Sequence, residues 1–76
     1  MARTLAQLKP GENARVVDVG GESSLQQRIL EMGILPGVDV RLIRVAPLGD
    51  PMEFEVIGYR LSLRKTEAAC VTVEGA

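Results

Sequence analysis

Apolar and polar residues alternate in several short segments of this chain. Val38, Val40 and Leu42, for example, alternate with Asp39 and Arg41. Alternation of this kind is typical of strands with one buried face, as are β-branched runs that end at glycine or proline. The pattern predicts five strands, at residues 14–19, 38–45, 52–56, 60–64 and 70–74.

Between the first two predicted strands, the apolar residues recur at helical spacing. Leu25, Ile29 and Met32 mark one face of a helix at about residues 24–32. Ser23 and Ser24 are alternative N-caps, because a glutamine follows each of them three residues later, as in a capping box. We therefore predict one α-helix inserted between the first two strands.

Two glycines after this helix are expected to have positive φ. Gly33 falls where a left-handed residue ends a Schellman motif, with Ile34 and Ile29 as the accompanying apolar pair. Pro36 and Gly37 occupy the second and third positions of a predicted type II turn, where proline sets φ and glycine takes positive φ. We assign structural roles to Gly33, Pro36 and Gly37.

The second predicted strand changes parity in its middle, because Leu42 and Ile43 are both apolar. Neighbouring residues of a strand point to opposite faces, so one of the two would face solvent in a regular strand. This predicts a β-bulge or a bend near Leu42 and Ile43.

Gly58 is predicted to begin a two-residue hairpin loop with Tyr59, because a type II′ turn prefers glycine at its first position. This register places Leu63 opposite Phe54 on the buried face, and Leu61 lies on the same face. We therefore assign structural roles to Gly58, Leu61 and Leu63.

Five strands of this length bury too little surface as an open sheet with two free edges. Closure into a small barrel removes those edges. The predicted fold is mainly β: a small SH3-like five-stranded barrel with one α-helix inserted between the first two strands. No linker or repeat divides the chain, so we expect a single domain at residues 1–76, with Leu5 and Leu8 capping its core.

The composition limits the chemistry that the chain can perform. It has no histidine to activate a nucleophile and no glycine-rich phosphate-binding motif. Nine basic and ten acidic residues leave a net charge of −1, and only two residues are aromatic. Proteins that bind nucleic acids rely on excess cationic charge and on aromatic side chains that stack on bases. We therefore expect no catalysis, no cofactor and no nucleic-acid binding.

Metal binding is also disfavoured by the composition. Cys70 is the one cysteine, and carboxylates alone do not select a soft transition metal. A free cysteine on an inward-facing strand is usually a small apolar residue, so we expect no metal site. A lone thiol fits a reducing compartment, and no apolar run approaches the roughly 20 residues of a membrane-spanning helix. We expect a cytoplasmic protein without direct membrane insertion.

The loop between the second and third predicted strands is a candidate for partner binding. Pro47 and Pro51 stiffen it, which lowers the entropic cost of ordering the loop on binding. Leu48 lies near its tip, followed by Asp50. Either Leu48 contacts a partner, or it folds back and plugs the end of the barrel. The outward face of the predicted helix, which includes Arg28, is a second candidate surface.

Three segments carry a family resemblance. They are RILEMGILPG at residues 28–37, RVAPLGDP at residues 44–51 and LSLRK at residues 61–65. In combination they resemble the FeoA family, small cytosolic SH3-like proteins associated with bacterial ferrous iron transport. The resemblance extends from Leu5 to Val73. The family is also similar in fold to the C-terminal SH3-like domain of iron-dependent repressors.

The resemblance implies a non-enzymatic accessory protein of ferrous iron uptake, which docks on the cytosolic part of the membrane transporter FeoB. Within this family, contact with the partner is a hypothesis for five residues: Arg28, Pro47, Leu48, Asp50 and Pro51. A metal-responsive sensing module, related to the repressor domain, is an alternative function. The oligomeric state stays open at this point.

Overall fold

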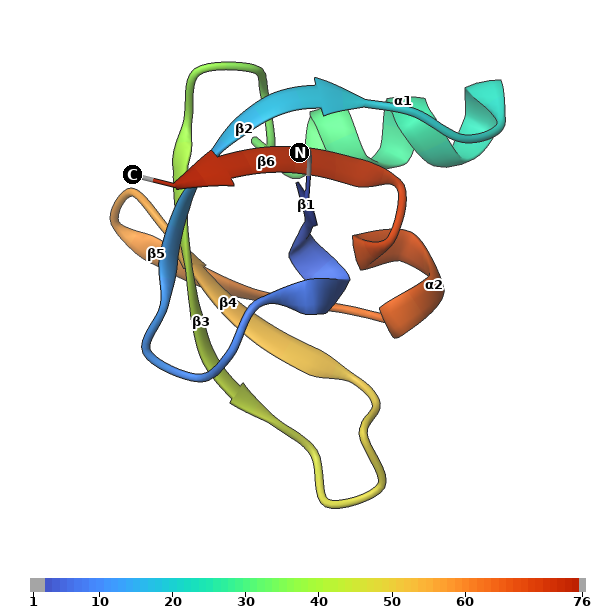
Figure 1. Cartoon of the computed structure of the whole chain (residues 1–76). Coiled ribbons are helices and arrows are strands. Elements are labelled where there is room, and N and C mark those ends of the chain that lie inside the picture. Colours follow the sequence, from blue (N-terminus) through green and yellow to red (C-terminus); the bar gives the residue numbers. More distant parts are fainter. Residues whose placement is uncertain (1–2, 76) are drawn as a thin grey trace.

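The computed structural model describes residues 3–75, and Met1, Ala2 and Ala76 of the predicted 1–76 domain lie outside the described residues. Six antiparallel strands form one sheet in the order β1-β6-β2-β3-β4-β5 (Figure 1). The strands are β1 (Arg3–Thr4), β2 (Asn13–Val19), β3 (Asp39–Val45), β4 (Met52–Val56), β5 (Tyr59–Leu63) and β6 (Val71–Gly75). The helices are the 3₁₀-helix η1 (Leu5–Gln7), α1 (Ser23–Glu31) and α2 (Lys65–Ala68).

The prediction of five strands in a closed barrel is wrong in two respects. A sixth strand, β1, pairs with β6, so α1 follows the second strand rather than the first. The sheet also stays open, with β1 and β5 as its two edges. The short helix that follows each edge strand contributes to the core instead: Leu5 of η1 and Ala68 of α2 are fully buried, and the two helices pack together. Two residues are too few to show alternation, which is why the pattern missed β1.

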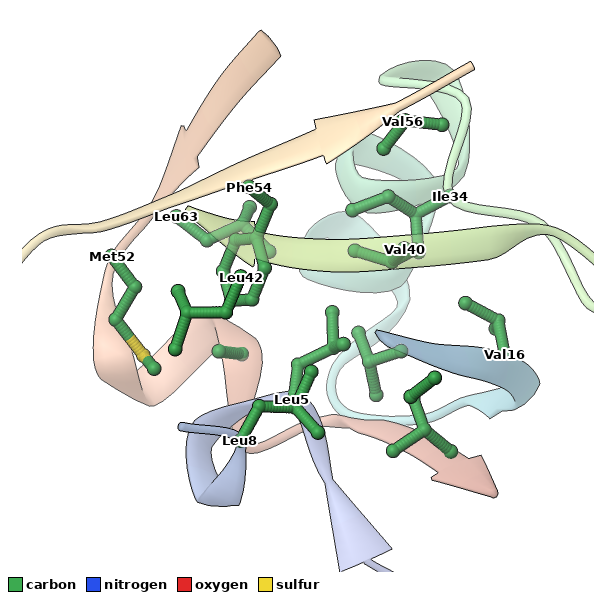
Figure 2. Close-up of a cluster of buried hydrophobic side chains, with 14 of the residues drawn as sticks. Leu5, Leu8, Val16, Ile34, Val40, Leu42, Met52, Phe54, Val56 and Leu63 are labelled. Atoms are coloured by element: carbon green, nitrogen blue, oxygen red, sulfur yellow. The ribbon is translucent and has the colours of Figure 1, made fainter. Parts of the chain in front are cut away.

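The alternating apolar residues form the core, as the pattern predicts. Phe54 and Leu42 are fully buried, and Val40 and Val73 are nearly so. Figure 2 shows side chains of the inner faces pointing toward one another. Leu5 and Leu8 enter this cluster from the N-terminal segment, where their predicted capping role is confirmed. Truncating a fully buried residue such as Phe54 to alanine costs about 3–5 kcal/mol in comparable cores.

A β-bulge lies where the parity change predicts it. The β3–β4 register shifts between Leu42 and Arg44, so Ile43 is the extra residue. A second bulge, which the pattern did not predict, lies in β2 at Val17, between Val16 and Asp18. Bulges increase the local twist of a strand, and here they curve the sheet around its core without closing it.

The predicted register of the β4–β5 hairpin is wrong by two residues. Leu63 lies opposite Met52, and Leu61 lies opposite Phe54, so the loop consists of Ile57 and Gly58. A shift of two residues leaves every side chain on its original face, so alternation alone cannot distinguish the two registers. Gly58 has φ of +80° at the second loop position rather than the first.

Helix α1 begins one residue before its predicted start and has Glu22 at the N-cap, without a side-chain capping hydrogen bond from either candidate serine. Its end has the two hydrogen bonds of a Schellman motif. The N–H of Gly33 donates to the carbonyl of Leu30 at 3.0 Å, and that of Ile34 to the carbonyl of Ile29 at 3.4 Å. Within residues 3–75, no helix is both long enough and apolar enough to cross a membrane.

The turn that leads into β3 is joined to the sheet. The N–H of Val38 donates to the carbonyl of Leu35 at 3.1 Å, which closes the turn around Pro36 and Gly37. Gly37 has φ of +93°, as the third position of a type II turn requires. Its N–H donates to the carbonyl of Val16 in β2 at 2.8 Å, so the turn cannot move independently of the sheet.

Candidate interaction surface

The loop between β3 and β4 projects away from the body of the molecule (Figure 1). Its neck is closed by the N–H of Ala46, which donates to the carbonyl of Pro51 at 3.0 Å. Near its tip, the N–H of Gly49 donates to the carbonyl of Ala46 at 2.7 Å. Leu48 is 96% exposed, so the alternative in which it plugs the end of the sheet is wrong. Leu5 and Leu8 fill the core instead.

Two of the loop's predicted contact residues border a shallow groove. Pro47 and Pro51 line a groove of about 470 Å³ together with Arg44, Val45, Ala46, Glu53 and Ser62. Prolines on both sides of Leu48 restrict the backbone dihedrals of the loop. The loop therefore presents an apolar tip beside a preformed hollow.

Asp50 has a positioning role at the base of the loop. Its Oδ1 accepts a hydrogen bond from the backbone N–H of Lys65 at 2.8 Å. Lys65 is the first residue of α2, where backbone N–H groups have no partner within the helix. Asp50 therefore joins the β3–β4 loop to the start of α2.

Arg28 of α1 also reaches α2. Its Nη2 lies 2.7 Å from Oε2 of Glu67, whose side chain is only 8% exposed. The other oxygen of Glu67 accepts a hydrogen bond from the backbone N–H of Arg64 at 2.8 Å. The sequence interpretation did not identify Glu67. Its signal was its position three residues after Arg64, where a carboxylate can bond back to the first N–H of a helical turn.

The structure therefore brings the predicted contact residues together only in part. Pro47, Leu48, Asp50 and Pro51 share one loop, whereas Arg28 lies on α1 and faces a different groove. That groove measures about 460 Å³ and is lined by Glu22, Ser24, Leu25, Arg28, Arg64, Thr66 and Glu67. Helix α2 links the two areas, because Asp50 binds its beginning and Arg28 binds its buried carboxylate.

Tyr59 is a second residue whose role the sequence interpretation missed. It begins β5, and its hydroxyl group donates a hydrogen bond to the carbonyl of Met32 at the end of α1. A Cβ atom at Gly33 would collide with this hydroxyl group. Gly33 is therefore needed both for its φ of +95° and for the space that Tyr59 occupies.

The solvent-facing side of the sheet carries charges of both signs. Arg44 and Glu53 are paired at 2.7 Å, and Arg60 lies 3.8 Å from the same carboxylate. Arg15 and Asp39 form another pair at 3.1 Å. In the β4–β5 hairpin, Ser62 lies opposite Glu53.

The carboxyl group of Glu12, just before β2, has a strongly shifted pKa. Arg3 donates to both oxygens of Glu12, at 2.6 and 3.0 Å, and the N–H of Lys9 donates to one of them at 2.9 Å. These hydrogen bonds, led by those from Arg3, favour the ionised carboxylate and lower the pKa of Glu12 to about 2. The same contact raises the pKa of Arg3 above its ordinary value.

Among residues 3–75, no three His, Cys, Asp or Glu side chains lie close enough together to hold a metal ion. Cys70 is partly buried, and its thiol group lies 3.5 Å from the carbonyl of Thr66.

Comparison with known proteins connects this geometry to a family. The family model of the FeoA domain matches residues 3–75. The Fe(2+) transport protein A/Fe(2+) transporter FeoB fusion protein of Porphyromonas gingivalis is 39% identical to the chain over 70 residues. Those residues are 92% of this chain but only 8% of the fusion protein, so the chain spans a small part of that relative's length.

Solved structures share the fold over nearly the whole chain. A FeoA-like protein from Clostridium acetobutylicum has a TM-score of 0.90 at 34% identity, covering 97% of this chain and 86% of that one. The FeoA of Stenotrophomonas maltophilia, complexed with zinc and described as a prokaryotic SH3 domain protein, has a TM-score of 0.85 at 31% identity. The alignment covers 96% of this chain and 91% of that one.

A manganese-dependent transcriptional repressor has a TM-score of 0.89 at 14% identity, covering 99% of this chain and 42% of the repressor. At this level of identity the likeness concerns the fold alone. The open six-stranded sheet is therefore SH3-like, and it is shared with part of a metal-dependent repressor.

Proposed function

This chain is a member of the FeoA family, which is linked to ferrous iron transport, and from this premise we propose a specific role for it. It is a cytosolic accessory protein of bacterial ferrous iron uptake. It acts by binding the cytosolic part of a FeoB-type transporter and performs no catalysis of its own.

The fusion protein of P. gingivalis carries this proposal. That protein is named as a fusion of an Fe(2+) transport protein A with the FeoB transporter, and it contains a segment similar to this chain. A covalent link raises the effective concentration of one partner near the other to about the millimolar range. Such a link is useful where two proteins act on each other, so the fusion supports the same association between separate chains.

The β3–β4 loop is the contact that we propose for this association. Leu48 is the most exposed of the large apolar side chains among residues 3–75, at 96%. The hydrogen bonds across the loop and the prolines beside Leu48 hold it in one shape, so little conformational entropy is lost on binding. Pro47 and Pro51 supply the adjoining groove, and Asp50 and Arg28 support the surface by holding α2 in place.

A binding measurement tests the partner and the loop separately. The purified chain is titrated into the purified cytosolic region of the FeoB-type transporter of the same organism, and heat release gives the affinity. We expect the wild type to bind and Leu48→Asp to bind at least about tenfold more weakly, because a carboxylate would have to be desolvated at the contact. Leu48→Met, which keeps the apolar character, serves as the matched control and should bind like the wild type.

This experiment distinguishes a wrong partner from a wrong contact site. Absence of wild-type binding would overturn the proposed partner. Wild-type binding that Leu48→Asp leaves unchanged would remove the loop from the contact and leave the partner in place. Both variants should unfold within about 0.5 kcal/mol of the wild type, because an exposed side chain contributes little to stability.

The metal-sensing alternative has its own test. Calorimetry with Fe²⁺ or Mn²⁺ in the absence of air measures whether the chain alone binds metal. Stoichiometric binding tighter than about 10 μM, which corresponds to roughly −7 kcal/mol, would favour sensing over the accessory role. Under the proposed function we expect weaker binding or none.

A further inference from the structure

The free edge of β5 is a second surface that is suited to binding. The sheet ends at β5, which pairs with β4 on one side and, among residues 3–75, with no strand on the other. An unpaired edge presents backbone N–H and C=O groups that a strand from another chain can bind. The part of the opposite edge, β1, that the structure describes has two residues and offers a much shorter line of such groups.

The hairpin register identifies which backbone groups are free. Hydrogen-bonded and non-hydrogen-bonded pairs alternate along an antiparallel ladder. Counted from the pair that closes the two-residue loop, Val56 and Tyr59, the positions of Arg60 and Ser62 are non-hydrogen-bonded toward β4. Their N–H and C=O groups therefore point to the open edge. Within residues 3–75, no other backbone hydrogen bond uses these groups.

Charge on the outer face of the sheet alternates from strand to strand. Arg41 and Arg44 lie on β3, opposite Glu55 and Glu53 on β4. Glu55 in turn lies opposite Arg60 on β5, whose side chain is 61% exposed. Opposite charges on facing strands stabilise a sheet. A strand added beyond β5 would continue this alternation if it carried acidic residues opposite Arg60.

The inner face of β5 is suited to apolar residues of an added strand. Leu61 points toward the core but is only partly buried, and Tyr59 is 44% exposed. Apolar residues on the inner face of an added strand would cover both side chains. At the other end of β5, Ser62 lines the groove beside Pro47 and Pro51, so the edge continues into the surface of the β3–β4 loop.

From these observations we propose that the free edge of β5 binds an extended segment of a partner protein, in which acidic and apolar residues alternate. The segment adds to the sheet as a seventh strand, with its acidic residues beside Arg60 and its apolar residues over Leu61. This deepens the proposed function by naming the kind of segment that the transporter's cytosolic region presents, and in that respect it rests on that function. A second copy of this chain fits the edge less well, because it would bring two arginine-bearing strands together.

A synthetic peptide tests the edge without the transporter, so the result does not depend on whether the proposed partner is right. Amide hydrogen exchange of the ¹⁵N-labelled full chain is followed by NMR, in the absence and in the presence of a seven-residue peptide of alternating valine and glutamate. At a free peptide concentration of about five times its Kd, exchange of the Arg60 and Ser62 amides should slow about sixfold, because only the unoccupied sixth of the protein exchanges. The Leu61 amide, which faces β4, should be unaffected by comparison.

Two variants and one control peptide make the result decisive. Ser62→Pro removes an edge N–H, which edge strands tolerate, and it should abolish the protection at Arg60 while the rest of the spectrum stays folded. Arg60→Glu should transfer the preference to a peptide of alternating valine and lysine, which the wild type should not bind.

Three results would overturn the proposal. The first is no slowing at millimolar glutamate peptide. The second is equal protection by both peptides, and the third is slowing that rises with the concentration of the chain alone, because self-pairing would then occupy the edge.

Discussion

Two connections of similar composition have opposite relations to the rest of the molecule. The connection from α1 to β3 and the loop from β3 to β4 both contain proline and glycine. The first is tied to the body of the protein: Gly37 donates to Val16 of β2, and Gly33 lies directly beside the hydroxyl group of Tyr59. It has almost no freedom to vary, because these contacts with β2 and β5 fix its path.

The second connection is held at its base and free at its tip. The side chain of Asp50 accepts a hydrogen bond from the N–H of Lys65, and the N–H of Ala46 donates to the carbonyl of Pro51. Beyond these contacts, a Cβ atom at Gly49 would meet no atom within 4 Å, and Leu48 is 96% exposed. Glycine and proline therefore serve the fold in one connection and shape an accessible surface in the other. The difference lies in what surrounds each residue, not in its type.

Substitution of the two glycines tests this contrast most strongly. Gly33 and Gly49 have similar φ, +95° and +90°, so alanine strains the backbone at both. We expect Gly49→Ala to lower the free energy of unfolding by about 1–2 kcal/mol and Gly33→Ala by about 2–4 kcal/mol, because only Gly33 also meets Tyr59. Urea denaturation measures both values.

The matched control for this comparison is Tyr59→Phe. Combined with Gly33→Ala, it removes the hydroxyl group that the new methyl group would meet, and it should recover part of the loss. Equal destabilisation by Gly33→Ala and Gly49→Ala would show that the surroundings do not matter and that φ alone decides the cost.

Removal of Arg28 should have the next largest effect. Arg28→Ala leaves the buried carboxylate of Glu67 without its cation, which should cost about 1–3 kcal/mol of stability. Arg28→Lys, which keeps the charge, should lose less. Binding to the transporter region should fall only as far as α2 is disturbed. A stable Arg28→Ala variant that fails to bind would instead make Arg28 a direct contact.

The base of the β3–β4 loop offers a smaller effect. Asp50→Ala removes the acceptor of the Lys65 N–H, and we expect a loss of about 1 kcal/mol. Asp50→Asn keeps an acceptor oxygen and should lose less. NMR chemical shifts of residues 46–51 and of α2 should move together in Asp50→Ala. Shifts confined to the loop would show that the loop and α2 are not coupled.

A third connection, the turn from Lys9 to Glu12, gives the smallest effect and shows it only through pH. The pKa of Glu12 is about 2 in the folded protein, below its ordinary 4.5, so the folded state holds fewer protons than the unfolded state between these values. The stabilisation is complete above about pH 4.5 and is lost as the pH falls toward 2. The wild type should therefore have a higher melting temperature than Glu12→Gln above about pH 4.5, and this difference should shrink as the pH falls toward 2. A difference in melting temperature that does not change with pH would contradict the contact with Arg3.

Local features of the fold follow from the sequence because they depend on neighbouring residues. The positive φ of Gly33, the turn at Gly37 and the bulge at Ile43 each have a signal within a few positions. The hairpin register was predicted wrongly, because a slip of two residues preserves every face. The free edges were missed because closure depends on how much core the short helices η1 and α2 supply.

For the candidate surface, the sequence predicted the exposed tip of the β3–β4 loop but not the contacts that hold α2 in place. Proline on both sides of an apolar residue marked Leu48 as the tip, and its exposure agrees. The roles of Asp50 and Arg28 as supports of α2 depend on Lys65 and Glu67, which lie 15 and 39 residues away in the sequence. No local pattern connects positions that far apart.

The order of apolar and polar residues was therefore enough to determine a small, mainly β protein with one principal helix, since burial and turn geometry act over a few residues. The resemblance to its family depended instead on the residue identities in the three segments 28–37, 44–51 and 61–65. The tertiary structure alone decided which edge stays open, which carboxylate meets which cation, and which side chains reach the surface. These outcomes depend on the packing of distant segments, where a shift of two residues changes the neighbours without changing the pattern.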